Sequence, residues 1–203
     1  GGRLPAWSPD GREIAFIASA GSGPGAGPGV TITLINADGS HAHTILSHPV
    51  IYGGLAWSPD GTHIAVAADV PSAPVGSGIL IVVPVDGGAP RVLATIVLGD
   101  APWPIGPRWS PDGARLAYID GRQLRVIGVG GGESKILTRP AADTFDVYPD
   151  WSPDGRLIAF ARGGDHLPRN VFVVSANGGP ARQLTHEDAH AVVASMDPIS
   201  WSA

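Results

Sequence analysis

The sequence contains no cysteine. Disulfide bonds, thiolate metal sites and cysteine nucleophiles are therefore excluded. Positive charge is also sparse, because 13 Lys and Arg residues stand against 18 Asp and Glu residues and no basic run occurs. This balance argues against a nucleic acid as a partner. No stretch of about 18 uninterrupted apolar residues exists, so no segment is predicted to span a bilayer as a helix.

Enzymatic signatures are equally scarce. The sequence lacks the Gly-x-Ser-x-Gly segment that carries the nucleophile of α/β-hydrolases. Its carboxylates fall in predicted loops and turns, and no pair of them lies on rigid elements as glycosidase chemistry requires. We therefore predict that the chain itself is not an enzyme and holds no cofactor.

What the sequence does contain is an internal repeat. The pentapeptide Trp-Ser-Pro-Asp-Gly begins at Trp7, Trp57, Trp109 and Trp151, and Trp201 begins another copy. The intervals are 50, 52, 42 and 50 residues, which is the size of a β-propeller blade. After each copy, large apolar residues alternate with one alanine, namely Ala15, Ala65, Ala117 and Ala159. This period of two predicts a strand whose alanine face receives the bulky face of the neighbouring sheet.

Further strands complete each repeat. One is predicted over residues 30–34, 79–83, 124–127 and 171–174, and each ends in a Gly-rich turn. A short last strand follows at 44–46, 91–93, 135–137 and 182–184. With the strand that enters each tryptophan, every repeat holds four strands joined by hairpins, which is one propeller blade. The predicted blades cover residues 3–47, 52–94, 104–138 and 146–185, and residues 198–203 begin a further one.

The unit Pro-x-Trp-Ser-Pro-Asp-Gly-x-x-Ile-Ala-Phe, followed by a strand ending in Asp-Gly and then by Leu-Thr, resembles the repeat of the TolB-like, WD-repeat-like β-propeller family. The fold class is therefore expected to be all-β, with four complete four-stranded antiparallel blades plus one strand. TolB-like relatives usually have six or more blades. The resemblance thus implies an open arc of a larger propeller, whose remaining blades would be partners, in the bacterial periplasm or elsewhere outside the cytoplasm.

The repeated aspartates are interpreted as turn residues. In Ser-Pro-Asp-Gly, proline presets φ, aspartate hydrogen-bonds nearby backbone, and glycine takes the left-handed position. The repeat tryptophans are likewise predicted to pack between blades.

Function is expected at the opposite ends of the strands. There, the second-to-third connections vary: residues 19–29, 69–78 and 162–170 are long, whereas the third repeat turns through residues 120–121 alone. Loop variation on a repeated scaffold is where recognition usually lies. The candidate residues for a ligand or partner on this face are Tyr52, Trp103, Asp146, Tyr148, Asp165, His166, His186 and Asp188. Trp103, flanked by prolines, is either an exposed anchor or packs over the blade rim.

Residues 186–190 read His-Glu-Asp-Ala-His, which matches the zinc motif His-Glu-x-x-His. The segment lies in a connection between blades and no third ligand is identifiable. We therefore predict no metal site, and His186 and His190 stay as the only metal candidates.

These observations lead to two functional hypotheses. The first is a non-enzymatic TolB-like scaffold that binds a protein or peptide through its long-loop face. The alternative, implied by a second resemblance, is the substrate-gating propeller of a prolyl oligopeptidase or dipeptidyl peptidase-like serine hydrolase whose catalytic domain lies outside this chain.

Overall fold

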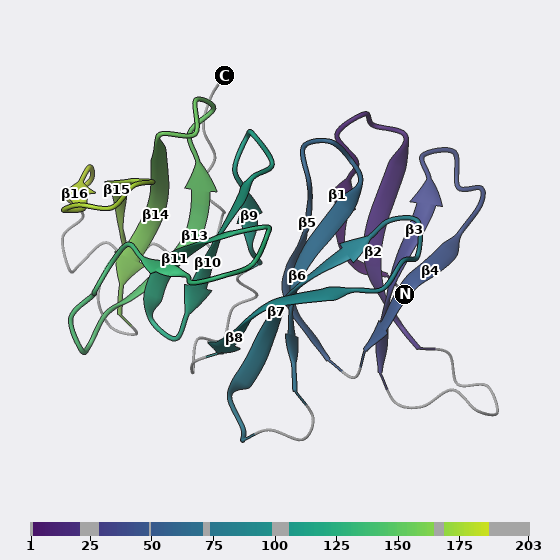
Figure 1. The fold of residues 1–203 in the computed structure, drawn as a ribbon, viewed down its shortest axis with the longest axis horizontal. Coiled ribbons are helices and arrows are strands. Elements are labelled where there is room, and N and C mark those ends of the chain that lie inside the picture. The colour runs from purple at the N-terminus through teal and green to yellow at the C-terminus, as the bar shows by residue number, and fades with distance from the viewer. Residues whose placement is uncertain are drawn as a thin grey trace. The chain divides into compact units, whose positions relative to one another are not determined.

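The computed structural model describes residues 2–20, 29–48, 50–70, 74–98, 106–164 and 169–186. These residues form four antiparallel sheets of four strands each, and none of them is helical (Figure 1). The first sheet holds β1 (Arg3–Trp7), β2 (Glu13–Ser19), β3 (Val30–Asn36) and β4 (His43–His48). The second holds β5 (Ile51–Trp57), β6 (His63–Asp69), β7 (Ser77–Pro84) and β8 (Arg91–Val97). The third holds β9 (Arg108–Trp109), β10 (Arg115–Asp120), β11 (Gln123–Gly128) and β12 (Lys135–Ile136). The fourth holds β13 (Phe145–Trp151), β14 (Leu157–Gly163), β15 (Asn170–Ser175) and β16 (Arg182–Gln183).

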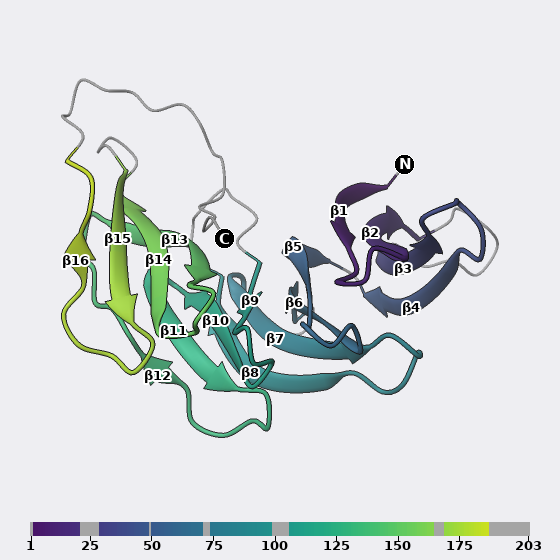
Figure 2. The ribbon, with the colours of Figure 1, turned by 90° about the horizontal axis from the view of Figure 1, so that it is seen from above.

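The strand order in every sheet follows the chain order, so each sheet is a four-stranded meander. This confirms the predicted all-β class and the blade as its unit. The chain divides into two compact units, Gly1–Pro107 with the first two blades and Arg108–Ala203 with the last two. Figure 2 shows the strands of each unit from above. The predicted strand at residues 198–203 lies outside the described residues.

The Ser-Pro-Asp-Gly turns have the predicted chemistry in all four blades. Their glycines adopt φ between 68° and 71°, the left-handed region that glycine enters without a steric penalty. In the second blade, Asp60 Oδ1 accepts hydrogen bonds from the Ser58 hydroxyl (2.6 Å), the Thr62 amide (3.0 Å) and the Thr62 hydroxyl (2.7 Å). These bonds, that of Ser58 foremost, lower the pKa of Asp60 from 3.8 to about 2.

A pH-dependent effect of Asp60→Asn follows from this turn. The folded-state pKa lies below the unfolded one, so the ionised carboxylate stabilises the fold above about pH 4, and this contribution is lost as the pH falls toward about 2. We expect Asp60→Asn to lower the urea midpoint at neutral pH, and the difference from the parent chain to shrink across that window. Urea titrations monitored by circular dichroism measure it. A difference that stays constant down to pH 2 would contradict the assignment.

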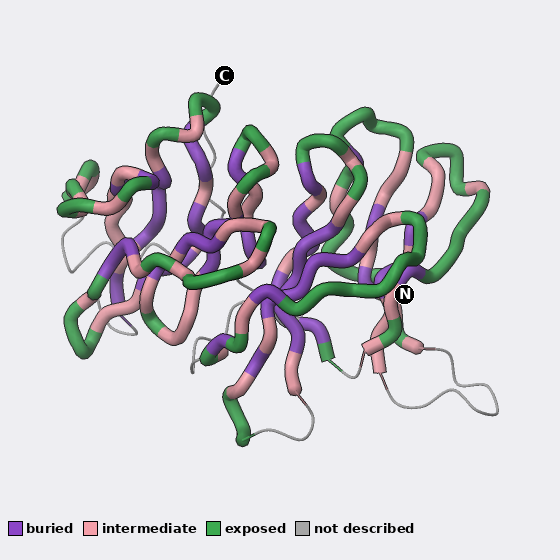
Figure 3. Tube along the Cα trace, in the orientation of Figure 1, coloured by how far each residue is buried: buried purple, intermediate pink, exposed green. Residues whose placement is uncertain are grey.

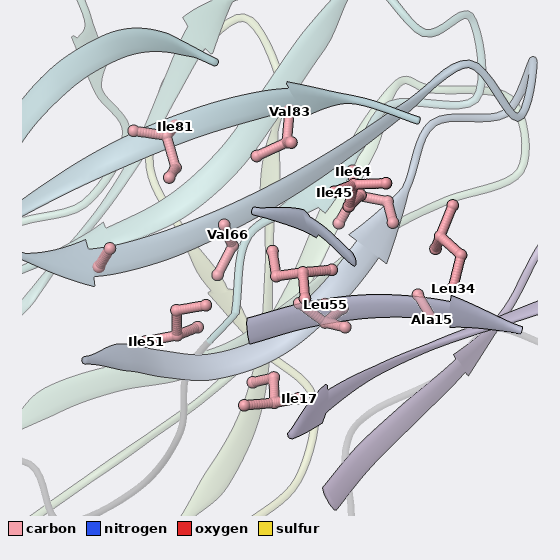
Figure 4. Packing of buried hydrophobic residues seen from close by; sticks show 12 residues of the cluster. Ala15, Ile17, Leu34, Ile45, Ile51, Leu55, Ile64, Val66, Ile81 and Val83 are labelled. Atoms are coloured by element: carbon pink, nitrogen blue, oxygen red, sulfur yellow. The ribbon is translucent and has the colours of Figure 1, made fainter. Parts of the chain in front are cut away.

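The core of the first unit shows how neighbouring blades fit together. The repeat alanine Ala15 of the first blade is 0% exposed, and it shares a buried cluster with Ile64 and Val66 of the second blade. In Figure 4, Leu55, Ile64 and Val66 of the second blade lie near Ile17, Leu34 and Ile45 of the first. Burial is concentrated along the strands and exposure at the turns, as Figure 3 shows. The predicted packing of bulky residues against alanine is therefore confirmed.

The repeat tryptophans join successive blades within each unit. Trp57 Nε1 donates a hydrogen bond to the carbonyl of Ala6 in β1 (3.0 Å). Trp151 Nε1 donates in the same way to the carbonyl of Arg108 in β9 (3.0 Å). Both acceptors directly precede the tryptophan of the preceding repeat. At Trp57 and Trp151 the ring thus satisfies its N–H in a contact with the preceding blade, which confirms the predicted role for these two residues. Trp7 is 60% exposed and does not follow the prediction.

The two ends of each sheet differ in their connections. We call the end with the Ser-Pro-Asp-Gly turns and the third-to-fourth turns the short-turn face. The other end is the long-loop face, which in the second unit comprises residues 120–123, 137–145, 162–164, 169–170 and 184–186. In Figure 1 the turns after β1 and β3 lie at the upper ends of those strands, and β2 runs down and away from them.

Candidate binding face

A buried ion pair lies at the long-loop end of the second unit. Arg162, near the end of β14, donates from Nε to Asp146 Oδ1 (2.6 Å) and from Nη2 to Asp146 Oδ2 (3.0 Å). The two residues are cross-strand partners in the register of β13 and β14. The carboxylate is 0% exposed and the arginine side chain 21%. Asp146 therefore holds a guanidinium in a fixed bidentate geometry and does not present its own charge to solvent.

A threonine connects this ion pair to the preceding blade. Thr138, which follows β12, donates its hydroxyl hydrogen to Asp146 Oδ2. The same hydroxyl oxygen accepts a hydrogen bond from the Leu124 amide of β11 (2.9 Å). A continuous chain of hydrogen bonds thus runs from the third blade to Arg162 in the fourth. Such a chain fixes the orientation of every group in it.

Two phenyl rings contact the Arg162 guanidinium. The Arg162 guanidinium carbon lies 5.3 Å from the centroid of the Phe160 ring and 5.0 Å from that of Phe172. The two rings stack on each other at 5.7 Å. Contacts of this kind add cation–π attraction to the ion pair. The guanidinium is therefore held both by the Asp146 carboxylate and by the two phenyl rings.

The ion pair replaces an apolar pair of the repeat. Arg162 lies three residues after the repeat alanine Ala159, where the second blade has Ala68. The second blade pairs Ala68 with Ile51, in the same register position as Arg162 with Asp146. Ile51 and Ala68 are 6% and 0% exposed. The blade can therefore close this position without charges.

Tyr148 lies in a bulge of the first strand. The register of β13 and β14 shifts between Val147 and Asp150, and Tyr148 has φ of 52°. Leu4 in β1 (φ 55°) and Gly53 in β5 (φ 81°) occupy similar bulges. A non-glycine residue in this region costs about 1–2 kcal/mol. Burial raises the pKa of the half-buried Tyr148 hydroxyl, and nearby Arg169 opposes that rise.

The other predicted residues divide into described and undescribed ones. His186 is exposed beyond β16, at the long-loop end of the second unit. Asp146 is the second residue of β13 at that same end, whereas Tyr148 lies in the middle of the strand. Tyr52 belongs to the first unit, where its backbone pairs with Ala67. Trp103, Asp165, His166, Asp188 and His190 lie outside the described residues.

A pocket of about 330 Å³ opens beside the ion pair, between the end of the third blade and the start of β16. Its lining includes Leu137, Thr138, Arg139, Arg162, Pro180 and Ala181. The sequence does not single out Arg139 or Arg162. The available signal is a charged residue at a repeat position that holds alanine in the first two blades, Ala18 and Ala68.

No grouping of three histidine, aspartate or glutamate side chains suited to a metal ion occurs among the residues that the structure covers. The same residues include no helix long and apolar enough to cross a membrane. The structure does not describe Glu187, Asp188 and His190.

The geometry has close counterparts among solved structures. TolB from Acinetobacter baumannii superposes with a TM-score of 0.68 and 22% identity over 91% of this chain. The chain has a TolB-like β-propeller fold. The putative TolB from Agrobacterium tumefaciens gives a TM-score of 0.68 and 21% identity over 88% of the chain. A puromycin hydrolase gives 0.68 and 19% over 91%. No family model and no curated protein matches the sequence.

These structures are longer than the chain. It spans 43% of the Acinetobacter TolB, 63% of the Agrobacterium protein and 31% of the puromycin hydrolase. Identities of this size establish a shared fold only, and the same fold serves unrelated activities. The partial coverage supports a fragment of a larger propeller, and its arrangement as an open arc remains a prediction.

Proposed function

We propose that the chain is a non-enzymatic propeller scaffold that binds a protein or peptide through its long-loop face, outside the cytoplasm. The observation that carries the proposal is the rigidly held Arg162 at the long-loop end of β14, beside a pocket that extends from there to the third-to-fourth turn at residues 179–181. The Ser-Pro-Asp-Gly turns of the short-turn face use their aspartates to accept hydrogen bonds from nearby backbone amides. Recognition groups on a rigid scaffold bind with less loss of conformational freedom.

The proposed contact residues keep the predicted set. Tyr148 and His186 contribute from the second unit, and Asp146 acts by positioning Arg162. Tyr52 contributes from the first unit. The proposal extends to Trp103, Asp165, His166 and Asp188 on the connecting segments.

The absence of cysteine allows a direct test by single-site labelling. Ala141→Cys lies on the long-loop face of the second unit and Val75→Cys on that of the first, and both positions are exposed. Ala114→Cys, exposed on the short-turn face of the second unit, is the matched control. Each variant is coupled to a maleimide-polyethylene glycol chain, and peptides selected from a displayed library are titrated against it.

We expect labelling at position 141 or at position 75 to weaken peptide binding at least about tenfold, a loss of about 1.4 kcal/mol, because the polymer covers the binding face. Labelling at 114 should leave the affinity unchanged. If both long-loop labels are harmless, or if the label at 114 alone abolishes binding, the proposal fails.

A second candidate is the propeller of a serine peptidase. It is favoured by the superposition on a prolyl endopeptidase, of which the chain covers 29% at a TM-score of 0.62. A Gly-x-Ser-x-Gly segment in a hydrolase-sized continuation of the coding sequence beyond Ala203 would favour this candidate over the first.

A further inference from the structure

We propose that the pocket between the third and fourth blades binds a carboxylate group presented by a peptide. This inference rests on the proposed function, since it names the chemistry that the long-loop face would recognise. The pocket lies within the second unit, and its lining residues include two arginines, Arg139 and Arg162.

The charges around the pocket do not cancel. The Asp146 carboxylate neutralises Arg162, whose Nε and Nη2 it occupies. Arg139 is exposed, and the described part of the chain gives its side chain no ion pair or hydrogen bond. One positive charge is therefore left over among the lining residues. A singly charged carboxylate matches it better than a phosphate group, which carries about −1.5 to −2 at neutral pH.

The two guanidiniums suit a planar ligand. Asp146 engages one edge of Arg162 and leaves Nη1 outside the bidentate contact. Guanidinium groups present N–H donors in a fixed plane that matches the two oxygens of a carboxylate. Because Arg162 is held by Asp146 and two phenyl rings, it can donate without first being ordered.

The remaining lining residues are uncharged, and four of them are apolar: Ile136, Leu137, Pro180 and Ala181. These surfaces suit the methylene groups of an acidic side chain or a short stretch of peptide. A volume near 330 Å³ is at the low end of ligand pockets, which span about 300–1,000 Å³. The pocket therefore fits one or two residues of a peptide.

Packing alone does not account for the arginine at position 162. At the corresponding register position the second blade has Ala68 paired with Ile51, and both residues belong to the apolar cluster that it shares with the first blade. A buried ion pair is often no more stabilising than the apolar pair that it replaces. Departures of this kind from a repeat are expected where a site is built. Arg162 lines the pocket, and it and its partner Asp146 are charged where the second blade has the apolar pair Ala68 and Ile51.

The test uses the ¹⁵N-labelled chain and three capped tripeptide probes. They are acetyl-Ala-Glu-Ala-amide, its glutamine counterpart, and acetyl-Ala-Ala-Ala as the free acid. We expect the glutamate probe to shift the amide signals of Leu137, Arg139 and Ala181 in a saturable way, with at least tenfold weaker binding of the glutamine probe. The free-acid probe shows whether a chain terminus is accepted as well as a side chain.

Arg139→Gln should weaken binding of the glutamate probe at least tenfold, and because this side chain is exposed the fold is not expected to change. Arg156→Gln, an equally exposed arginine on the short-turn face, should have no effect. The inference is overturned if neither acid gives saturable shifts, if the glutamine probe binds equally well, or if Arg139→Gln binds like the parent chain. If the inference fails but library peptides still bind the parent chain, the proposed function stands. If no library peptide binds the parent chain, both the inference and the proposed function fail.

Discussion

The Arg162→Ala variant is expected to lose about 3–5 kcal/mol of unfolding free energy, because it leaves the Asp146 carboxylate buried without its cation. The carboxylate is 0% exposed with the arginine in place, and the variant removes both guanidinium donors to it. Thr138 is the remaining side-chain donor to it. Urea unfolding followed by far-ultraviolet circular dichroism measures the loss.

The matched control is the double variant Asp146→Ile with Arg162→Ala. It installs the apolar pair that the second blade uses at this position, Ile51 with Ala68. We expect its stability to return to within about 1–2 kcal/mol of the parent chain. Equal destabilisation of the single and double variants would show that the ion pair is not replaceable by the repeat's own solution, and would contradict our account of it.

A loss of similar size, about 3–5 kcal/mol, is expected for Trp151→Ala. The indole is 5% exposed and donates to the Arg108 carbonyl. The Arg115 guanidinium lies over its ring at 4.8 Å. Removing it therefore deletes buried area, a hydrogen bond and a cation–π contact between the third and fourth blades.

Trp7→Ala is the matched comparison, because Trp7 occupies the same position in the first repeat as Trp151 does in the fourth. Trp7 is 60% exposed, so this substitution should change the unfolding free energy by less than about 1 kcal/mol. Trp151→Phe separates the hydrogen bond from the area, with an expected loss of about 1 kcal/mol for the bond alone. Similar losses for Trp7→Ala and Trp151→Ala would contradict the assignment of the repeat tryptophan to blade packing.

Much of the fold is predictable from the sequence because it is encoded locally. Period-two alternation around Ala15 or Ala65 gives strands, and Ser-Pro-Asp-Gly gives a turn whose bonds span only a few residues. A sheet made of consecutive hairpins needs no long-range information beyond this. The same sequence pattern occurs in four blades, so a feature found in a single copy can be told apart from the features that define the blade.

The ion pair of Asp146 with Arg162 is not predictable in the same way. The two residues are joined across β13 and β14, and the bulge at Tyr148 changes the register between them and the turn. A shift of one residue reverses which side chain faces the neighbouring blade. The sequence therefore places Asp146 on the correct end of the strand, and only the structure shows that its carboxylate points inward to an arginine.

The bulge itself carries a weak sequence signal. Gly53 is compatible with a left-handed conformation, but Leu4 and Tyr148 adopt it against their usual preference. Both residues lie where the register of the first strand shifts against the second. This explains why a reading of turn residues identifies the Ser-Pro-Asp-Gly turns and misses the bulges.

We propose that the long-loop face, and not the repeated turns, is the binding surface. Amide hydrogen exchange of the chain, with and without a saturating selected peptide, tests it most directly. We predict protection in residues 120–123, 137–145 and 184–186, with unchanged exchange in the turns at residues 110–114 and 152–156. Protection confined to those turns would contradict the claim.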